Sequence, residues 1–596
     1  MRHIGLALVM FSALAVCARA ETTLRVIPPQ GATFAPGQHF DVRIEADDLR
    51  GQPRQFTVEV NGHDSKRELF GVEEFNIFRA PVTGRGATTS TIMNGGVIRR
   101  DWSLDKAGKY EIKATLTDAD GKKYTASSMI VVETLPPAPV RAKNVILFIG
   151  DGMGPSVRTA ARIMSKGIEG GKAKGLLEMD QMETVGLVMT SSLDALVTDS
   201  SPGASAWATG NKSLNNWHGV FPDNTGPVTG GGGLDRNTES TRPYLDNPRV
   251  ENLAEFLQRT RHMSTGVVST VAVTDSTPGA FSSHSIRYAQ NAIAEQMLSS
   301  GHSVILGGGA RYFLPQDSPL LGNITSARTD GRNLVEEFKK SGFTFVSNAT
   351  ELERAGRVDK LLGLFHGAEM ASRYDRNRAK AGINTAKEAL GRFQDQPTLE
   401  LMTQQALNVL GKNPNGFFVM IEAGSIDREL HRLDPNRAVD EVIELDKAIG
   451  IARAWSSERG HEETLILVTA DHDTAGLVLT GVNENGRPSS RAFPNYEDKN
   501  FDGFPDDFQP EFGLTFDFPS SFNPPKDHKA NDLPRNIREL NPTVSLPPPA
   551  PGGPALAGHS AVDVPISARG PGAILFTGVQ DNTEIFFKIL RALGEK

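Results

Sequence analysis

Residues 21 to about 135 contain short runs in which apolar and polar side chains alternate. This alternation is typical of β-strands that have one face in a core and the other in water. Clusters of turn-forming residues separate the runs, as at Asp118–Gly121. We therefore predict an all-β module at 21–135, followed by a stiff proline-rich linker at 136–142. The predicted strands are Thr23–Ile27, Phe40–Ala46, Phe56–Val60, Tyr110–Thr117 and Tyr124–Val132.

From Lys143 the pattern changes to continuous apolar runs that alternate with longer helical stretches. Continuous apolar runs indicate strands buried on both faces, as in the parallel sheet of an α/β domain. We predict that 143–596 forms an α/β domain with a mostly parallel central sheet flanked by helices. The predicted strands are Asn144–Ile149, Gly266–Val273, Ser303–Leu306, Gly416–Ile421, Thr464–Thr469 and Ala573–Phe576. The predicted helices are Ser156–Lys166, Ala289–Ser299, Asp427–Arg432, Ala438–Glu458 and Thr583–Leu593.

The pattern fails at about 486–554, where Pro, Asp, Asn and Phe dominate and aliphatic runs are few. We interpret this segment as an acidic insertion into the α/β domain. Inside it, acidic or amide side chains recur at alternate positions around Gly503, a spacing that can wrap a calcium ion. The stretch resembles the calcium loops of thrombospondin type 3 repeats, although a merely acidic turn explains it equally well. The candidate calcium residues are Asp498, Asn500, Asp502, Phe504 and Asp506.

The stretch 197–210 predicts a helix that begins at a serine. Asp199 and Ser200 precede a second Ser, a Pro and a run of small residues, and Gly210 closes the run. Ser and Pro favour helix starts and Gly favours the position after the end. Ser200 is therefore expected at a helix N-terminus, where free N–H groups attract phosphate. Its hydroxyl needs a base or a metal ion to act as a nucleophile, and an ordinary capped helix remains the alternative.

The composition narrows the choice of partners and compartment. The chain has 596 residues and a formal net charge of −8, which argues against nucleic acid as a specific partner. Residues 1–20 fit a secretory signal peptide with a cleavage site at Ala18–Ala20, so we expect a periplasmic or secreted protein. The apolar run within residues 1–20 is too short to span a membrane, and we expect no membrane partner. The single cysteine, Cys17, lies in this segment, so the mature chain would have neither a disulfide nor a thiolate ligand.

Side chains that can bind metal ions follow several of the predicted strands. In an open parallel sheet the ligand site lies beyond the carboxyl ends of the strands, so these side chains are expected to meet. Asp427 and His431 are four residues apart and would share one face of a helix. Each residue alone also fits a cap, a turn or a surface pair, but their joint occurrence favours a metal site. The set is Asp151, Thr277, Glu422, Asp427, His431, Asp471, His472 and His559, the last in a loop before the last predicted strand.

Five segments together resemble the alkaline phosphatases, and they occur in the order of that family. They are Ile-Gly-Asp-Gly-Met-Gly, Val-Thr-Asp-Ser followed by Ala-Trp-Ala-Thr-Gly, Ile-Glu-Ala-Gly-Ser-Ile-Asp, Thr-Ala-Asp-His-Asp and Gly-His-Ser. The resemblance runs from Lys143 to the C-terminus, interrupted by the insertion. It implies metal-dependent hydrolysis of small-molecule phosphate monoesters through a phosphoserine on Ser200. Before it, Ala107–Tyr110 and the strand that follows resemble the tyrosine corner of immunoglobulin-like sandwiches.

The resemblance also implies two Zn²⁺ ions and one Mg²⁺ ion. One zinc ion would be held by Asp427, His431 and His559. The second would be held by Asp151, Asp471, His472 and the Ser200 oxygen. Magnesium would take Asp151, Thr277 and Glu422, which offer only oxygen, as that ion requires.

Three further residues would serve the phosphate. Arg287 would grip two phosphate oxygens with its planar fork. Asp275 and Arg428 would support the magnesium water and the phosphate, and the Arg428 position varies within the family. A related phosphodiesterase or sulfatase, and a non-catalytic secreted binding protein, remain alternative functions. Members of the family are often homodimers, so a homodimer is one candidate assembly, and the sequence leaves the oligomeric state open.

Overall fold

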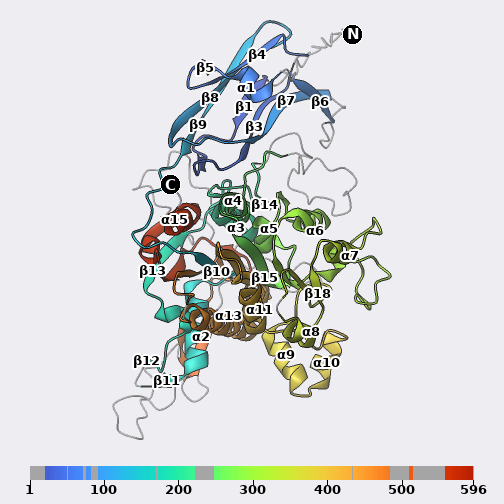
Figure 1. Cartoon of the computed structure of the whole chain (residues 1–596), viewed down its shortest axis with the longest axis vertical. Helices are drawn as coiled ribbons and strands as arrows, with labels where there is room; N and C mark the ends of the chain where they lie inside the picture. Colours follow the sequence, from blue (N-terminus) through green and yellow to red (C-terminus); the bar gives the residue numbers. More distant parts are fainter. Residues whose placement is uncertain are drawn as a thin grey trace, which may run out of the picture. The chain divides into compact units, whose positions relative to one another are not determined.

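The structure is a computed structural model (Figure 1). It describes residues 21–49, 51–71, 75–81, 91–169, 172–221, 247–356, 358–432, 434–458, 460–483, 509–513 and 557–594. The predicted signal peptide at 1–20, with Cys17, and the predicted calcium loop at 498–506 lie outside the described residues. The chain divides into two compact units. The first contains 1–30, 42–99 and 110–129, and the second contains 31–41, 100–109 and 130–596.

The first unit is built from β-strands, as predicted. Its strands are β1 (Thr23–Ile27), β3 (Phe40–Asp47), β4 (Gln55–Val60), β5 (His63–Asp64), β6 (Asn76–Pro81), β7 (Thr91–Trp102), β8 (Gly108–Thr117) and β9 (Lys123–Val132), some of which end in the second unit. One sheet has the order β1-β3-β7-β6, and the other contains β9-β8-β4-β5. On β8, Ile112, Ala114 and Leu116 are buried while the residues between them are only half-buried, so one face forms the core. Phe75 contacts the ring of Phe56 on the second sheet and closely approaches Gly95 on the first.

The second unit is organised around a ten-stranded sheet, which confirms the predicted α/β class. Its order is β18-β19-β17-β15-β20-β10-β21-β26-β13-β27, and every pair is parallel except those of β26 with β21 and β13. The bounds, in that order, are Thr344–Val346, Leu361–Leu364, Val304–Gly308, Ser264–Ala272, Phe417–Ala423, Asn144–Gly150, Thr464–Thr469, Val564–Arg569, Thr184–Met189 and Gly578–Asp581. The central strands β10, β20 and β21 are buried along their whole length, as their continuous apolar sequences predict.

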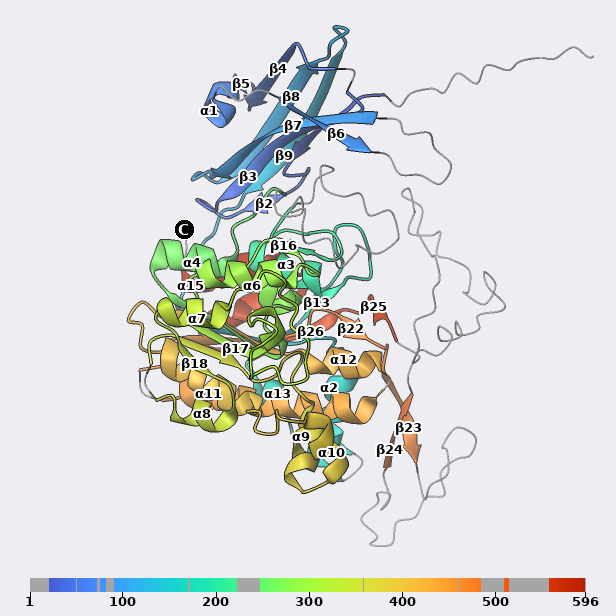
Figure 2. The same cartoon turned by 90° about the vertical axis from the view of Figure 1, so that its right-hand side faces the viewer.

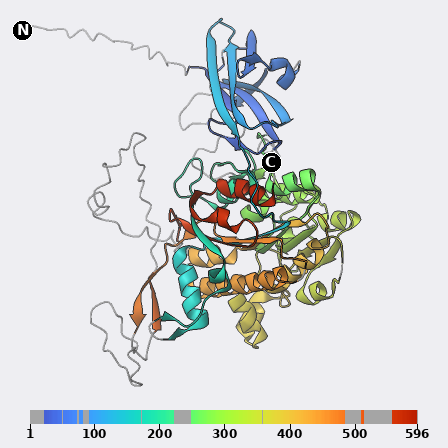
Figure 3. The ribbon, with the colours of Figure 1, turned by 60° about the vertical axis from the view of Figure 1, so that its left-hand side comes forward.

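Helices cover both faces of this sheet. Figure 2 shows α3 (Ser200–Thr209), α4 (Leu253–Arg261), α6 (Gln290–Ser299) and α15 (Glu584–Leu593) on one face. It shows α2 (Pro155–Lys166), α11 (Leu399–Leu410) and α13 (Pro435–Ser456) on the other. Figure 3 shows the same layering, with α15 in red above the strands and α13 in orange below them. The predicted linker at 136–142 is fixed to this unit, because the amides of Ala138 and Ala142 donate to carbonyl oxygens of α15.

One predicted strand is wrong. Ala573–Phe576 forms a 3₁₀ helix between β26 and β27. Ala573 and Phe576 are buried whereas Ile574 is exposed, so the buried positions recur every three residues. A period of three is that of a 3₁₀ turn, and a short apolar run does not reveal its period from composition alone.

Among the helices that the structure describes, none has the length and the apolar character needed to span a membrane.

Gly186, in the middle of β13, provides a test of the packing at the β13–β27 end of the ten-stranded sheet. A Cβ atom there would lie 2.3 Å from the Phe576 carbonyl oxygen and 2.7 Å from that of Gly578. Main-chain atoms cannot move aside easily, so we expect Gly186→Ala to cost about 1–3 kcal/mol and to lower the thermal unfolding midpoint. In the control, Gly175→Ala, the nearest atom is the flexible Lys166 side chain at 3.4 Å. Equal midpoints for the two variants would contradict this account.

Candidate active site

Ser200 is the first residue of α3, as its sequence predicts. The Asp199 side chain caps the helix by accepting from the Ser201 amide at 3.3 Å, and Gly210 ends it in the left-handed conformation (φ 73°). Ser200 is buried, and its Oγ lies 3.2 Å from Nε2 of His472. The nucleophile candidate therefore combines a helix N-terminus with an imidazole from a distant strand.

His431 and His559 point their Nε2 atoms at one another. His431 ends α12 (Ser425–His431), and His559 lies on the short strand β25 (His559–Ser560), which pairs with β22 (Asp473–Thr474). Figure 2 shows α12, β22 and β25 together. The two Nε2 atoms are 3.1 Å apart, and Nε2 of His431 is 3.2 Å from Oδ2 of Asp427.

The other ring nitrogens of these histidines fix the rings. Nδ1 of His431 is 2.5 Å from the Ala557 carbonyl oxygen, and Nδ1 of His559 is 2.8 Å from that of Thr198. A carbonyl can only accept, so each Nδ1–H donates. In neutral rings both Nε2 atoms then carry lone pairs, which cannot bond to each other. Two nitrogen ligands of a tetrahedral zinc ion lie about 3.3 Å apart, so a shared cation fits this pair.

His472 has three oxygen atoms around its Nε2. Besides Ser200 Oγ, these are Oδ2 of Asp471 at 3.2 Å and Oδ1 of Asp151 at 3.5 Å. Both carboxylate oxygens are buried, yet neither has a hydrogen-bond partner among the described residues. Buried polar atoms are normally satisfied, so two unpartnered carboxylate oxygens beside an imidazole nitrogen fit a cation.

The third predicted group is Thr277 with Glu422 and Asp151, and these residues are close enough to influence one another. Burial raises the pKa of Glu422 while Thr277 lowers it, and burial with the charge of Glu422 raises the pKa of Asp151. Glu422 lies near the end of β20 and accepts from Ser269 Oγ at 2.5 Å. Thr277 belongs to α5 (Ser276–Ala280), and its buried Oγ1 makes no hydrogen bond of ordinary geometry within the described chain. The site offers oxygen atoms only, which suits magnesium.

The carboxyl pKa values show how crowded these acids are. Burial, with the charges of Asp471, Asp427 and Glu422, raises the pKa of Asp151 well above its usual range. Burial and nearby acids raise the pKa of Glu422 to about 8 and that of Asp471 to about 6. Burial alone would also raise the pKa of Asp427, but the hydrogen bond with His431 and the charges of His559 and His472 hold it low. A cation would relieve the repulsion among these groups.

Among the residues that the structure describes, two groups of His and carboxylate ligand atoms are close enough to hold an ion. They are Asp427 with His431 and His559, and Asp151 with Asp427 and His472. The first is the predicted trio. In the second, Asp427 stands where the resemblance implies Asp471, whose Oδ1 accepts from the amides of Gly152 and His472 at 3.0 Å.

Thr474 is a site residue that the sequence did not reveal. Its Oγ1 lies 2.6 Å from Oδ1 of Asp427, to which it donates, and 3.2 Å from Nδ1 of His472. It is also the strand partner of His559. One hydroxyl thus touches both ligand groups, and the only sequence signal was its place after Asp471 and His472.

The two predicted arginines are already paired with acids. Arg287 contacts Asp199 through Nη1, and its Nη2 is 3.2 Å from Oδ1 of Asp275. Arg428 donates to the other Asp275 oxygen at 2.5 Å. Burial alone would lower the pKa of Arg287, but Asp199 and Asp275 raise it, so the guanidinium stays charged. The guanidinium groups of both arginines therefore lie at the site, and an incoming anion must share them with carboxylates.

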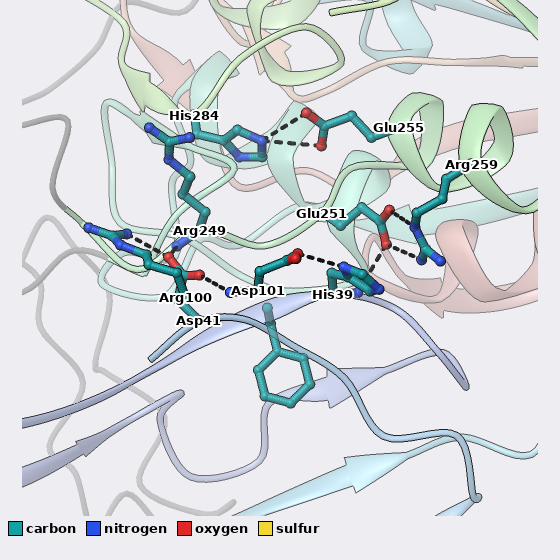
Figure 4. Close-up of a pocket in the computed structure, with 10 residues that line it drawn as sticks. His39, Asp41, Arg100, Asp101, Arg249, Glu251, Glu255, Arg259 and His284 are labelled. Atoms are coloured by element: carbon teal, nitrogen blue, oxygen red, sulfur yellow. Dashed lines mark hydrogen bonds and ion pairs between the residues drawn. The ribbon is translucent and has the colours of Figure 1, made fainter. Parts of the chain in front are cut away.

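A separate cavity of about 660 Å³ lies elsewhere in the second unit (Figure 4). None of its lining residues belongs to the predicted site. Its charged groups are largely paired, as in the contacts of Arg259 with Glu251, His284 with Glu255 and His39 with Asp101. The predicted chemistry is therefore not in this cavity.

Comparisons with known proteins agree with this geometry. The family model described as alkaline phosphatase matches residues 142–594. The chain is 28% identical to streptomycin-6-phosphate phosphatase of Streptomyces griseus over 78% of this chain and 96% of that one. It is 31% identical to alkaline phosphatase H of Pseudomonas aeruginosa over 76% of this chain and 86% of that one. The solved alkaline phosphatase from the Antarctic bacterium TAB5 is 26% identical, with a TM-score of 0.51 over 76% of this chain and 98% of that one.

Thr474→Val tests whether the bridging hydroxyl organises the ligands. The substitution keeps the shape but removes the contacts to Asp427 and His472, and loss of such supporting contacts commonly weakens metal binding about 10–100-fold. We expect a shift of that size when the metal-free protein is titrated with Zn²⁺ against a chromophoric chelator. Thr159→Val is the control, because that hydroxyl only donates to Pro155 within α2. Unchanged affinity in Thr474→Val would contradict the assigned role.

Proposed function

This chain belongs to the alkaline phosphatase family and hydrolyses phosphate monoesters, and we propose that it does so through a phosphoserine on Ser200. The observation that supports the proposal most is the convergence on Ser200 of side chains from separate strand ends. Asp151 follows β10, and Asp471 and His472 follow β21. Their unpartnered oxygens surround the same imidazole that faces Ser200 Oγ.

We propose two Zn²⁺ ions and one Mg²⁺ ion as cofactors. The zinc ligands are Asp427, His431 and His559 for one ion, and Asp151, Asp471 and His472 with Ser200 for the other. Asp427 also offers an oxygen near those of Asp151 and the ring nitrogen of His472, so it could contribute to the second ion. The magnesium ligands are Asp151, Thr277 and Glu422. A variant of the TAB5 enzyme is described with Mg bound in its M3 site, and the oxygen-only group here has the matching chemistry.

The reaction itself takes place between Ser200, the substrate and water. When bound, the metal ions lower the pKa of the attacking hydroxyl and stabilise charge on the oxygens of the phosphoryl group. Ser200 Oγ forms a bond to phosphorus as the alcohol leaves, which produces the phosphoserine. Water then attacks the phosphorus from the opposite side, the Oγ–P bond breaks, and phosphate is released.

Other residues of the chain position the phosphoryl group. The first amides of α3 and the guanidinium of Arg287 donate to its non-bridging oxygens. Asp199 keeps both in place, since it caps α3 and contacts Arg287. Asp275 joins Arg287 to Arg428 and so sets the distance between the two cations.

Other features of the whole protein are part of the same proposal. Cleavage after residue 20 would send the protein to the periplasm or the medium, with domains at 21–135 and 143–596. The loop at 498–506 would bind calcium. Exposed apolar side chains on the last two strands of the ten-stranded sheet, β13 and β27, support a homodimer. They are Val185, Leu187, Met189 and Val579.

Ser200→Ala is the direct test of the nucleophile. The variant lacks the attacking oxygen, so we expect loss of turnover by several orders of magnitude and no phosphoserine after acid quenching with a labelled monoester. The neighbouring variant Ser201→Ala should still carry the label on Ser200, as judged by peptide mapping. A covalent phosphate on any other residue would refute the assignment. Parallel assays with a diester and a sulfate ester separate this function from a phosphodiesterase or a sulfatase.

Removal of metal ions is expected to abolish activity and to lower stability together. Without cations the buried acids repel one another, and ligands that bind only the folded chain stabilise it by mass action. Dialysis against a chelator should reduce both turnover and the thermal midpoint, and Zn²⁺ with Mg²⁺ should restore both. Elemental analysis should give two zinc ions and one magnesium ion per chain. A chelated protein that keeps full activity would contradict the proposed cofactors.

A further inference from the structure

A row of alternating charges leads from the helix of the nucleophile to the rim of the site. Asp199 contacts Arg287, and Arg287 contacts Asp275. Arg428 binds the other oxygen of Asp275 and also lies 3.2 Å, through Nη1, from Oε1 of Glu369. Glu369 ends the row, and the mechanism above gives it no role.

Arg428 is the outer cation of this row. The exposed fraction of the side chain rises from 11% at Asp275 to 30% at Arg428 and 40% at Glu369. The two ends of the Arg428 fork are held by different acids, Nη2 by Asp275 and Nη1 by Glu369. A guanidinium held at both ends keeps one orientation, and here that orientation commits both nitrogens to the protein.

The backbone around Glu369 is fixed on both sides. The amides of 309–311, which follow β17, donate to the carbonyl oxygens of 366–368 at 2.7–3.0 Å. On the other side, the Met370 amide donates to the Thr270 carbonyl at 3.1 Å. Glu369 therefore reaches Arg428 from a rigid segment at the carboxyl end of β19, so its contact with Arg428 is built into the fold.

We propose that Glu369 is a positioning residue that restrains Arg428 and thereby weakens the grip of the site on phosphate. The proposal rests on the proposed function, because phosphate is the product that must leave. Without the Glu369 carboxylate, Nη1 of Arg428 is free to donate to a phosphate oxygen. The same change removes a negative charge from the rim. Both effects favour bound phosphate, so Glu369 speeds release of the product at the expense of affinity.

Glu369→Gln tests the proposal through the inhibition constant for inorganic phosphate. Exposed ion pairs are worth up to about 1 kcal/mol, so we expect this constant and KM to fall about two- to fivefold, without a rise in kcat. Glu336→Gln is the matched control. It breaks a different exposed ion pair, that of Glu336 with Lys339 at 2.8 Å, and should leave both constants unchanged. Unchanged phosphate inhibition in Glu369→Gln would overturn the proposal.

Two further variants separate restraint of Arg428 from simple repulsion. Glu369→Asp keeps the charge but shortens the side chain. Restraint of Arg428 therefore predicts that the phosphate inhibition constant shifts in the same direction as in Glu369→Gln. An unchanged constant would overturn the proposal. In an Arg428→Met background, Glu369→Gln should have no further effect on phosphate inhibition. A full effect there would show that Glu369 acts without Arg428, against the proposal.

The proposed function and this inference can fail separately. Direct binding of inorganic phosphate to the metal-loaded protein, measured by calorimetry, needs no turnover. A wild-type protein that does not hydrolyse monoesters would refute the function. A calorimetric affinity for phosphate that is the same in wild type and Glu369→Gln would refute the inference alone.

Discussion

Negative charge buried at the carboxyl ends of the central strands is the constraint on which the rest of the site depends. Asp151, Glu422 and Asp471 lie within a small volume whose crowding raises their pKa values. Burying carboxylates without partners is costly, and two of their oxygens, Oδ1 of Asp151 and Oδ2 of Asp471, have no hydrogen-bond partner within the described chain. Bound cations remove this cost. If the proposed ions bind here, the same residues link folding to metal binding.

The position of the nucleophile and the geometry of the ligands are fixed by shared contacts. The ring of His559 is oriented by the carbonyl of Thr198, which lies two residues before Ser200. Thr474 pairs with His559 and also touches Asp427 and His472. A displacement of β25 would therefore move a ligand and the start of α3 together. This coupling ties together residues from distant parts of the chain, and the described chain contains no cysteine that could do so through a disulfide.

The sequence made most of this architecture predictable, because strong local signals coincide with the site. Continuous apolar runs mark β10, β20 and β21, and the cap and closing glycine of α3 place Ser200. The short run at Ala573–Phe576 was wrongly predicted as a strand, since four apolar residues fit a strand and a 3₁₀ turn alike. Glu369 had no local signal, and Thr474 had only its place after Asp471 and His472, because the importance of both comes from the side chains that the fold brings beside them.

The paired state of the arginines has a consequence for recognition of phosphate. Arg287 and Arg428 are held by carboxylates, so an incoming phosphoryl group exchanges partners with these acids. The free energy of that exchange is the difference between the new ion pair and the one it replaces, so it is smaller than the energy of the new pair alone. A dianionic monoester competes with a carboxylate more effectively than a monoanionic diester does. Under the proposed mechanism, the acids that hold the two guanidinium groups would favour monoesters over diesters and keep the product from binding too tightly.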